Sequence, residues 1–256
     1  MIIPYHDWYI MLYEYGWYLP NGIGKFGTYC ADIRLAASRD GVKYRRILPH
    51  QKTIRRGGRG TWDSGMLVIC DKAVIKDNTI YIYYCGNDWE WTSWPAQNLP
   101  PGTGFKALRA RRPCRMGLAT LALDRFTCLQ TCDGESCGTV VTAPMMVRDA
   151  ASAHLVVNID GTAPGRSWFA VDLLDGATGE PLAGYASDDS TDTTEDGLSV
   201  GVQWKAQQTL AGVKCDRIRL RFRFYGKAKL YSFHFDKNSP HGAVTPGRIT
   251  SASATT

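Results

Sequence analysis

Apolar and polar residues alternate along this chain in short runs, which clusters of Gly, Asp, Asn and Pro separate. A period of two residues is typical of β-strands, and the longer period of an amphipathic helix is hard to find anywhere in the sequence. The runs that predict strands are 8–15, 33–38, 66–70, 79–85, 116–123, 154–159, 167–174, 197–204, 217–224 and 229–235. The pattern therefore predicts an all-β fold.

The clearest alternation is the sequence RLRFRF at 219–224. It places Leu220, Phe222 and Phe224 on one face of a strand and the intervening arginines on the other. A half-buried antiparallel strand of this kind is typical of a β-sandwich. We therefore expect an antiparallel β-sandwich over 148–236. The last residues, 237–256, contain two prolines and a Ser/Thr/Ala-rich end, which predict a disordered tail.

The first half of the chain contains a degenerate repeat. The segment 9–16 resembles 79–86 in composition and in its final glycine, and 32–38 resembles 115–121 in the same way. A unit of about four strands that is used twice is the signature of propeller blades. We therefore expect a partial β-propeller of about two blades over 1–147. Two successive hairpins that resemble each other by chance are the alternative.

The formal net charge is +6, and much of it lies in two loops, 43–59 and 106–115. A surface of this kind suits an acidic sugar or nucleic acid, although a solvated basic loop explains it equally, and we consider nucleic acid unlikely. No apolar run is long enough for a membrane-spanning helix. The N-terminal run contains His6, Asp7 and Glu14 and has no cleavage site, so it is not a signal peptide. It is typical of the middle of a sheet, which suggests that the chain begins partway through a larger ancestral domain.

Neither cysteine nor acidic clusters predict a cofactor. The spacing of Cys128, Cys132 and Cys137 contains no paired CxxC motif, which disfavours zinc, and the eight cysteines are too few for a disulfide scaffold in a chain of this length. A reducing, cytoplasm-like compartment is slightly favoured. The acidic loop 188–196 has oxygen ligands for calcium but not the order of an EF-hand. Motifs of kinases, dehydrogenases, serine hydrolases and zinc proteases are absent from the sequence.

Several short motifs, in their order along the chain, carry a resemblance to a known family. In the first half they are SRDGV at 38–42, GTWDSGM at 60–66, IYYCG at 82–86 and MGLA at 116–119; in the second half they are LVVN at 155–158, VDLLD at 171–175, GY at 184–185, VQW at 202–204 and AKLYSFHF at 228–235. The chain resembles the last blades and the C-terminal sandwich of five-bladed propeller proteins related to glycoside hydrolase families 32 and 43. It is most similar to an uncharacterised bacterial group within them.

The resemblance implies a carbohydrate-active protein that lacks part of its propeller. A complete five-bladed propeller needs about twice the length of the first half, and the carboxylates of this family come from innermost strands of early blades, which have no counterpart here. Two blades also leave open sheet edges. The chain is therefore expected to be a fragment or to associate with copies of itself, and to be weakly active or inactive alone.

Glycoside hydrolysis needs two carboxyl groups across a cleft, at about 5 to 9.5 Å from each other. Asp63, beside Trp62, is the best candidate, because the repeat predicts that its strand lines the propeller axis; capping of a turn is the alternative. Glu14 is the second candidate, unless alternation turns it to solvent, and Asp7 is weaker. Asp40 in the sequence SRDG resembles a sialidase-type Asp box, in which the aspartate ties a hairpin turn.

Aromatic and basic residues supply the candidate substrate-binding positions, and Trp62, beside Asp63, is one of them. Trp89, Trp91 and Trp94 lie close together in one loop and could form a stacking platform for sugars, or pack back onto the domain. Arg56 and Arg59 could hold a carboxylate or sulfate group of a substrate, or form part of a solvated loop. These residues predict a glycoside hydrolase-like, carbohydrate-active protein. A non-catalytic carbohydrate-binding or assembly module is the alternative.

Overall fold

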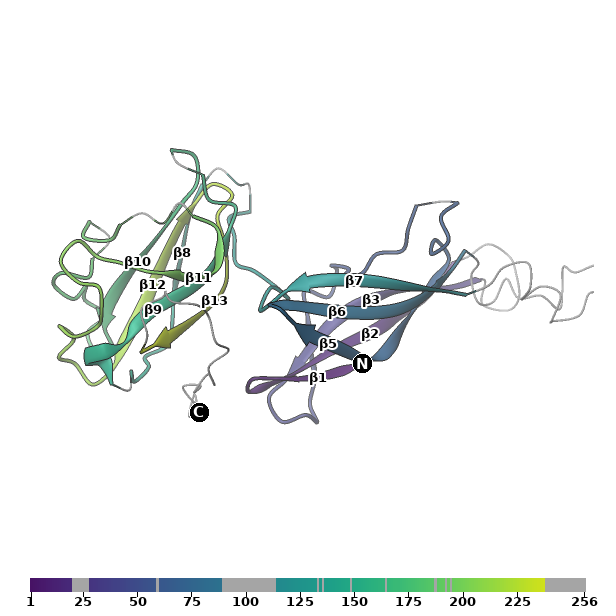
Figure 1. Ribbon diagram of the computed structural model, residues 1–256, viewed down its shortest axis with the longest axis horizontal. Helices are drawn as coiled ribbons and strands as arrows, with labels where there is room; N and C mark the ends of the chain where they lie inside the picture. Colours follow the sequence, from purple (N-terminus) through teal and green to yellow (C-terminus); the bar gives the residue numbers. More distant parts are fainter. Residues whose placement is uncertain are drawn as a thin grey trace, which may run out of the picture. The chain divides into compact units, whose positions relative to one another are not determined.

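The structure, a computed structural model, describes residues 1–19, 28–58, 60–88, 114–132, 134, 136–147, 149–163, 165–186, 188–191, 193 and 195–237. It divides into two compact units, Met1–Leu121 and Ala122–Thr256 (Figure 1). Both units are built of β-strands, as the sequence predicts, and the described residues contain no α-helix.

The first unit is one open sheet of seven strands. They are β1 (Ile2–Tyr5), β2 (Trp8–Leu19), β3 (Thr28–Ser38), β4 (Arg45–Ile47), β5 (Met66–Lys76), β6 (Thr79–Asn87) and β7 (Arg115–Ala122). The order in the sheet is β1-β2-β3-β5-β6-β7, and β4 pairs with β3. A single parallel pair, Ala31 with Met66, connects β3 to β5. The pairs β1–β2, β2–β3, β3–β4 and β5–β6 are antiparallel.

The sequence repeat corresponds to strand pairs with a shared packing feature. Its two copies are β2 with β3 and β6 with β7, and the strands of each pair are neighbours in the sheet. A Cβ atom on Gly16 of β2 would lie 1.8 Å from the Tyr29 hydroxyl oxygen, and one on Gly86 of β6 would lie 2.8 Å from the Trp62 ring. Each final glycine therefore leaves room for an aromatic side chain over the strand. Within the described residues the sheet is not closed, and strand pairing between its two halves is limited to one residue pair.

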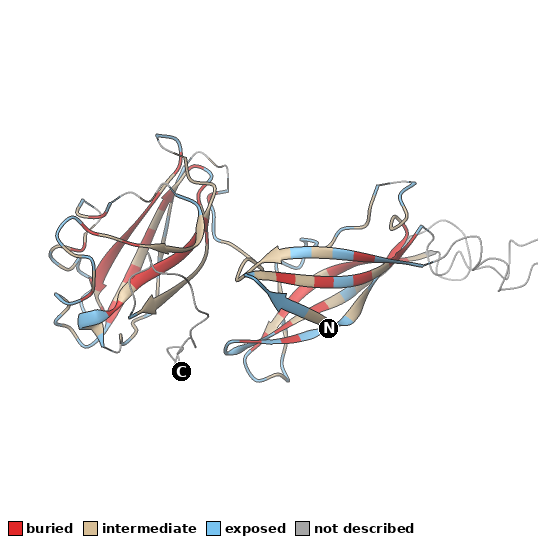
Figure 2. Cartoon of the chain, viewed as in Figure 1, coloured by how far each residue is buried: buried red, intermediate tan, exposed pale blue. Residues whose placement is uncertain are grey.

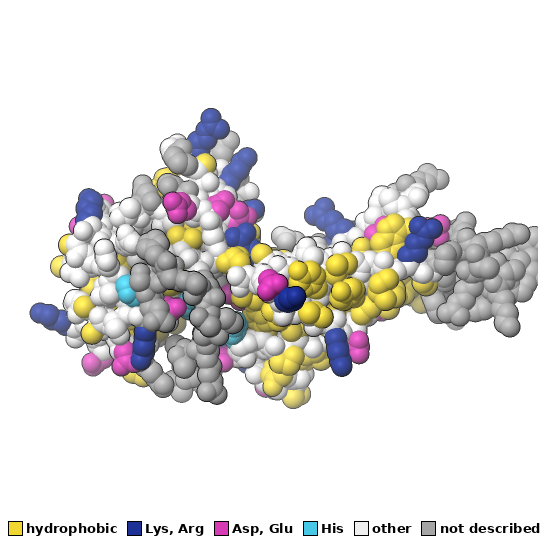
Figure 3. Space-filling view, viewed as in Figure 1, with side chains coloured by type: hydrophobic (Ala, Val, Ile, Leu, Met, Phe, Trp, Pro, Cys, Tyr) yellow, Lys and Arg dark blue, Asp and Glu magenta, His cyan; other side chains and the backbone are white. Residues whose placement is uncertain are grey.

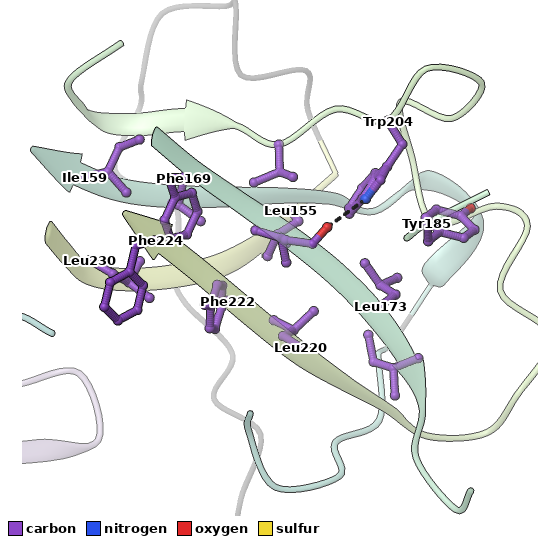
Figure 4. Close-up of a cluster of buried hydrophobic side chains, with 14 of the residues drawn as sticks. Leu155, Ile159, Phe169, Leu173, Tyr185, Trp204, Leu220, Phe222, Phe224 and Leu230 are labelled. Carbon is purple, nitrogen blue, oxygen red and sulfur yellow. Dashed lines mark hydrogen bonds between the residues drawn. The ribbon is translucent and has the colours of Figure 1, made fainter. Parts of the chain in front are cut away.

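The second unit consists of two antiparallel sheets that share a core. Its strands are β8 (Cys137–Val141), β9 (His154–Asp160), β10 (Trp168–Asp175), β11 (Gly197–Gly201), β12 (Ile218–Tyr225) and β13 (Lys229–Asp236). One sheet has the order β10-β12-β8 and the other β11-β9-β13. Leu155 and Ile159 of β9 pack with Leu220 and Phe222 of β12 in one buried cluster (Figure 4). The arrangement is sandwich-like.

The alternation predicted for 219–224 is confirmed. Ile218, Leu220, Phe222 and Phe224 are all buried, whereas the arginines between them are partly exposed. Figure 2 shows that the strands of this unit carry most of its buried residues. The core also encloses Trp204, whose indole Nε1 donates a hydrogen bond of 2.9 Å to the carbonyl oxygen of Val171 (Figure 4). Burial of this polar group is therefore compensated by a hydrogen bond.

The compact units divide at Leu121/Ala122, whereas the sequence pattern placed the junction near residue 147. The reason is that β8 pairs with β12 over five residues and so belongs to the second unit. The segment before β8 is also attached there, because Arg125 donates to the Asn158 side chain and to the Ile159 carbonyl oxygen, both at 3.0 Å. The predicted tail lies outside the described residues from position 238 onward.

Candidate carbohydrate site

Asp63 lies at a corner between two loop segments and β6. Its Oδ1 accepts a hydrogen bond of 2.9 Å from the Thr61 hydroxyl, and its Oδ2 accepts one of 3.4 Å from the Tyr84 hydroxyl. The backbone of Gly57 packs against the carboxylate, since a Cβ atom there would lie 2.1 Å from Oδ1. Burial and the negative charge of Asp63 raise the pKa of Tyr84. The carboxylate is thus fixed in position and still partly exposed.

Trp62 lies over two strands beside this carboxylate. Its ring stacks on Tyr84 with 5.8 Å between centroids and 20° between planes. The ring is also in close contact with two glycines, because a Cβ on either Gly86 or Gly117 would come within 2.8 Å of it. The neighbouring strands β6 and β7 therefore have no side chain where the indole packs. Trp62 is half-buried, so part of its apolar surface reaches solvent. We call Trp62, Asp63 and Tyr84 the Trp62 corner.

Arg56 connects the Trp62 corner to a second group of rings and charges. Its Nη1 donates to the carbonyl oxygens of Ser64 and Gly65 at 3.1 and 3.0 Å. Its guanidinium carbon lies 5.1 Å from the centroid of the Trp17 ring, which is cation–π distance. The arginine predicted to hold a substrate anion therefore also holds the 64–65 backbone in place. Within the part of the chain that the structure describes, its buried Nε atom has no hydrogen-bond partner.

The second group lies on one face of β2 and β3, around Trp17. Tyr15 pairs with Asp32 in the antiparallel register, and Tyr13 pairs with Arg34, so these side chains share a face with Trp17. The Arg34 guanidinium stacks 3.7 Å from the Tyr15 ring centroid. Rings and cations are thus packed together on this face.

Asp32 is a fully buried acid of β3 that was not among the predicted site residues. Its side chain has no exposed surface, and Oδ1 accepts a 2.9 Å hydrogen bond from Arg34 Nε. Lys52 Nζ lies 3.5 Å from Oδ2 without hydrogen-bond geometry. The signal that could have found Asp32 is its position between Ala31 and Ile33 in a strand that is otherwise apolar there. Asp32 orients the two cations and is not itself accessible.

Glu14, the second predicted catalytic carboxylate, is exposed and attached elsewhere. It pairs with Ile33 in the register, so it lies on the opposite face of β2 from Tyr15 and Trp17. Its Oε1 accepts a 3.1 Å hydrogen bond from the backbone N–H of Ile69 in β5. Burial, followed by the charge of Glu14, raises the pKa of Tyr29. No contact between Glu14 and Asp63 is found in the described part of the chain.

Other predicted positions have different outcomes. Trp89, Trp91, Trp94 and Arg59 lie outside the described residues. Asp40 ties its turn as expected, because Oδ1 accepts hydrogen bonds from the Ser38 hydroxyl and from two backbone N–H groups. These bonds, chiefly those from the Lys43 and Val42 backbone, lower the pKa of Asp40.

Neither the acidic loop nor the cysteines gather into a metal-binding group within the described residues. In the acidic loop, Asp196 accepts hydrogen bonds from the backbone N–H and the hydroxyl of Thr162, at 2.9 and 2.7 Å. Lys205 Nζ donates to the carbonyl oxygen of Asp188. Calcium, the alternative that the sequence left open, therefore stays untested.

A strip of exposed apolar side chains covers part of β5, β6 and β7. Figure 3 shows hydrophobic side chains gathered over these strands in the first unit. Its larger members are Val68, Tyr83, Met116 and Leu118, which are 36 to 65% exposed. Because β7 is at one end of the sheet order, the strip reaches an open edge, where strands of another sheet can add.

Comparisons of the chain with protein-family models, with curated proteins and with solved structures found no match. Within the described ranges, no helix has both the length and the hydropathy that crossing a membrane requires. The geometry of the Trp62 corner and of the group around Trp17 is therefore the basis for a functional conclusion.

Proposed function

We propose that this chain is a carbohydrate-binding protein whose ligand occupies the Trp62 corner. The observation that carries the proposal is a partly exposed carboxylate, Asp63, held by two hydroxyl donors beside a partly exposed indole. Sugars offer hydroxyl groups that donate to a fixed carboxylate, and C–H faces that pack on an aromatic ring. The corner presents both kinds of group within adjacent residues.

Two cations near Trp17, Lys52 and Arg56, add hydrogen-bond donors that suit a polar ligand. Lys52 lies 5.7 Å from the Trp17 ring centroid and is 39% exposed, so its ammonium group is available to ligand oxygens. Arg56 is held between Trp17 and the 64–65 backbone, which reduces the entropy lost when a ligand binds. Pre-positioned donors beside a ring favour binding of a polyhydroxyl compound over binding of a purely apolar one.

Glycoside hydrolysis is the second candidate, and Asp63 is the observation that favours it. Hydrolysis requires a second carboxyl group at about 5 to 9.5 Å. Glu14 lies on the other face of β2 from the Trp17 group and accepts a bond from Ile69, and Asp32 is buried between two cations. The described carboxylates thus support binding better than turnover.

We also propose, from the resemblance, that the first unit consists of two propeller-type repeats that are completed by further blades or by a second copy. The repeated strand pairs, each with a glycine under an aromatic side chain, support this view. The exposed apolar strip that reaches β7 is consistent with added strands.

A glycan array, followed by calorimetric titration of the best ligand, tests the proposed function. The variant Asp63→Asn keeps the shape of the side chain but weakens its acceptor strength, and we expect it to lower affinity by about tenfold, as for a lost charge-assisted hydrogen bond. The control is Asp71→Asn, an exposed acid of β5, which should bind as wild type.

Two outcomes decide between the candidates. Equal affinity of the Asp63→Asn and Asp71→Asn variants would remove the Trp62 corner from the binding site. Reducing ends released from the bound glycan by wild type, and not by Asp63→Asn, would establish the hydrolase instead.

A further inference from the structure

A second surface with aromatic and charged groups lies on the outer face of the sheet β10-β12-β8. In the β10–β12 register, Trp168 pairs with Tyr225, and Asp172 pairs with Arg221, so the members of each pair share a face. The residues between them, among them Val171 and Phe222, point into the core. Arg219 and Arg223 alternate with the same core residues and therefore also lie on the outer face.

The aromatic end of this face is formed by two rings in nearly parallel planes. The centroids of Trp168 and Tyr225 are 6.1 Å apart, with 17° between the ring planes. Both side chains are partly exposed. The face is also exposed at the adjacent strand β8. Thr139 and Val141 are exposed there, and they pair with Arg223 and Arg221 in the register. The two rings therefore stack at one end of this face, and part of each ring remains exposed beside the open β8 side.

The middle of the face carries an excess of positive charge in a fixed geometry. Asp172 has no exposed surface and binds both Arg221 Nε and Arg223 Nη2, the latter at 3.0 Å. The side chains of Arg221 and Arg223 remain 31 and 32% exposed. Arg219 lies on the same face, but its Nε donates to the carbonyl oxygen of Gly176 at 3.2 Å. Among the described residues, the buried Arg223 Nε has no hydrogen-bond partner. The carboxylate orients the guanidinium groups and neutralises only one of the three charges.

We infer that the outer face of the β10-β12-β8 sheet binds a polysaccharide that carries carboxylate or sulfate groups. Planar guanidinium groups recognise such oxyanions in a bidentate manner, and the neighbouring rings supply an apolar surface for the sugar face. This surface belongs to the second unit, whereas the Trp62 corner belongs to the first. The inference shares with the proposed function only the idea that the ligand is a carbohydrate.

The test uses the full chain and three polysaccharides in affinity gel electrophoresis: polygalacturonate for carboxylate, heparin for sulfate and laminarin as a neutral glucan. We expect retardation by at least one of the two anionic polymers. Arg223→Lys keeps the charge but loses the planar fork, and Trp168→Leu keeps apolar volume but loses the ring. Each should weaken binding by at least about fivefold, while Lys214→Ala, which removes one exposed charge elsewhere, should not change it.

Selectivity for polygalacturonate identifies carboxylate as the recognised group, and selectivity for heparin identifies sulfate. The inference is overturned if neither anionic polymer binds, or if Lys214→Ala weakens binding as much as Arg223→Lys. Equal or tighter binding of a single-stranded DNA also overturns it. The two substitutions act independently, so a folding defect in one, visible by circular dichroism, leaves the other to decide. Asp63→Asn should not affect this binding, so failure here is distinct from failure of the proposed function.

Discussion

At the scale of single residues, the Trp62 corner depends on positions that lack a side chain. Gly86 and Gly117 leave the space that the indole occupies, and Tyr84 closes it by stacking. The sequence identified Trp62 and Asp63 through the motif GTWDSGM at 60–66. The repeat over 79–86 predicted that Gly86 ends a strand. It could not show that the glycines lie beneath the indole, because that contact joins residues more than twenty positions apart.

The packing of Trp62 against Gly86 predicts that a side chain at position 86 destabilises the Trp62 corner. In Gly86→Ala the new Cβ would lie 2.8 Å from both Trp62 Cζ3 and Asp63 Cβ, so the corner must move. We expect a loss of about 1–3 kcal/mol in the free energy of unfolding in urea, together with weaker glycan binding. The matched control is Gly58→Ala, where a Cβ meets nothing within 4 Å. Equal stability of the two variants would show that Trp62 does not pack over β6.

Asp32 illustrates the limit of residue-level prediction. Alternation places it on the same face of β3 as Arg34, but only the structure shows that Arg34 and Lys52 both converge on its carboxylate. A long-range ion pair to a loop leaves no local periodic signal. The same holds for Glu14, whose partner in β5 is 55 positions away.

At the scale of elements, the strands with strong apolar alternation were predictable, and the weakly apolar ones were not. The alternating sequence RLRFRF at 219–224 predicts β12, and the buried and exposed faces of this strand are as predicted. Strand β8, with the sequence CGTVV, has a short and ambiguous pattern, so it was absent from the predicted strands. Its assignment to the second unit comes from pairing with β12, which is a non-local contact.

The pairing of β8 with β12 predicts which fragment of the second unit is the more stable. A fragment of residues 122–237 keeps β8 and the Arg125 contacts to β9, whereas one of residues 148–237 loses both. We expect the longer fragment to unfold cooperatively in urea with an ordered near-ultraviolet circular dichroism spectrum. The shorter fragment should be less stable, because β12 loses its neighbour β8 and the core loses Val140, which packs against it. Equal stability of the two fragments would contradict the division at Leu121/Ala122.

At the scale of the whole molecule, two units of different architecture each offer a surface with rings and fixed charges. In the first unit a carboxylate is presented beside an indole, and in the second unit guanidinium groups are presented beside two rings. The two surfaces thus suit different ligand groups, hydroxyls in one and oxyanions in the other. The +6 net charge is consistent with an anionic ligand for the second surface and does not determine the ligand of the first.

The most direct test of the central claim is hydrogen exchange of the full chain, followed by mass spectrometry, with and without the tightest-binding glycan from the array. We predict slower exchange in peptides that cover 52–65 and 82–87, because the ligand would occupy the Trp62 corner and shield the loop segments around it. Glycan binding with unchanged exchange in both segments would contradict the claim that this corner is the carbohydrate site.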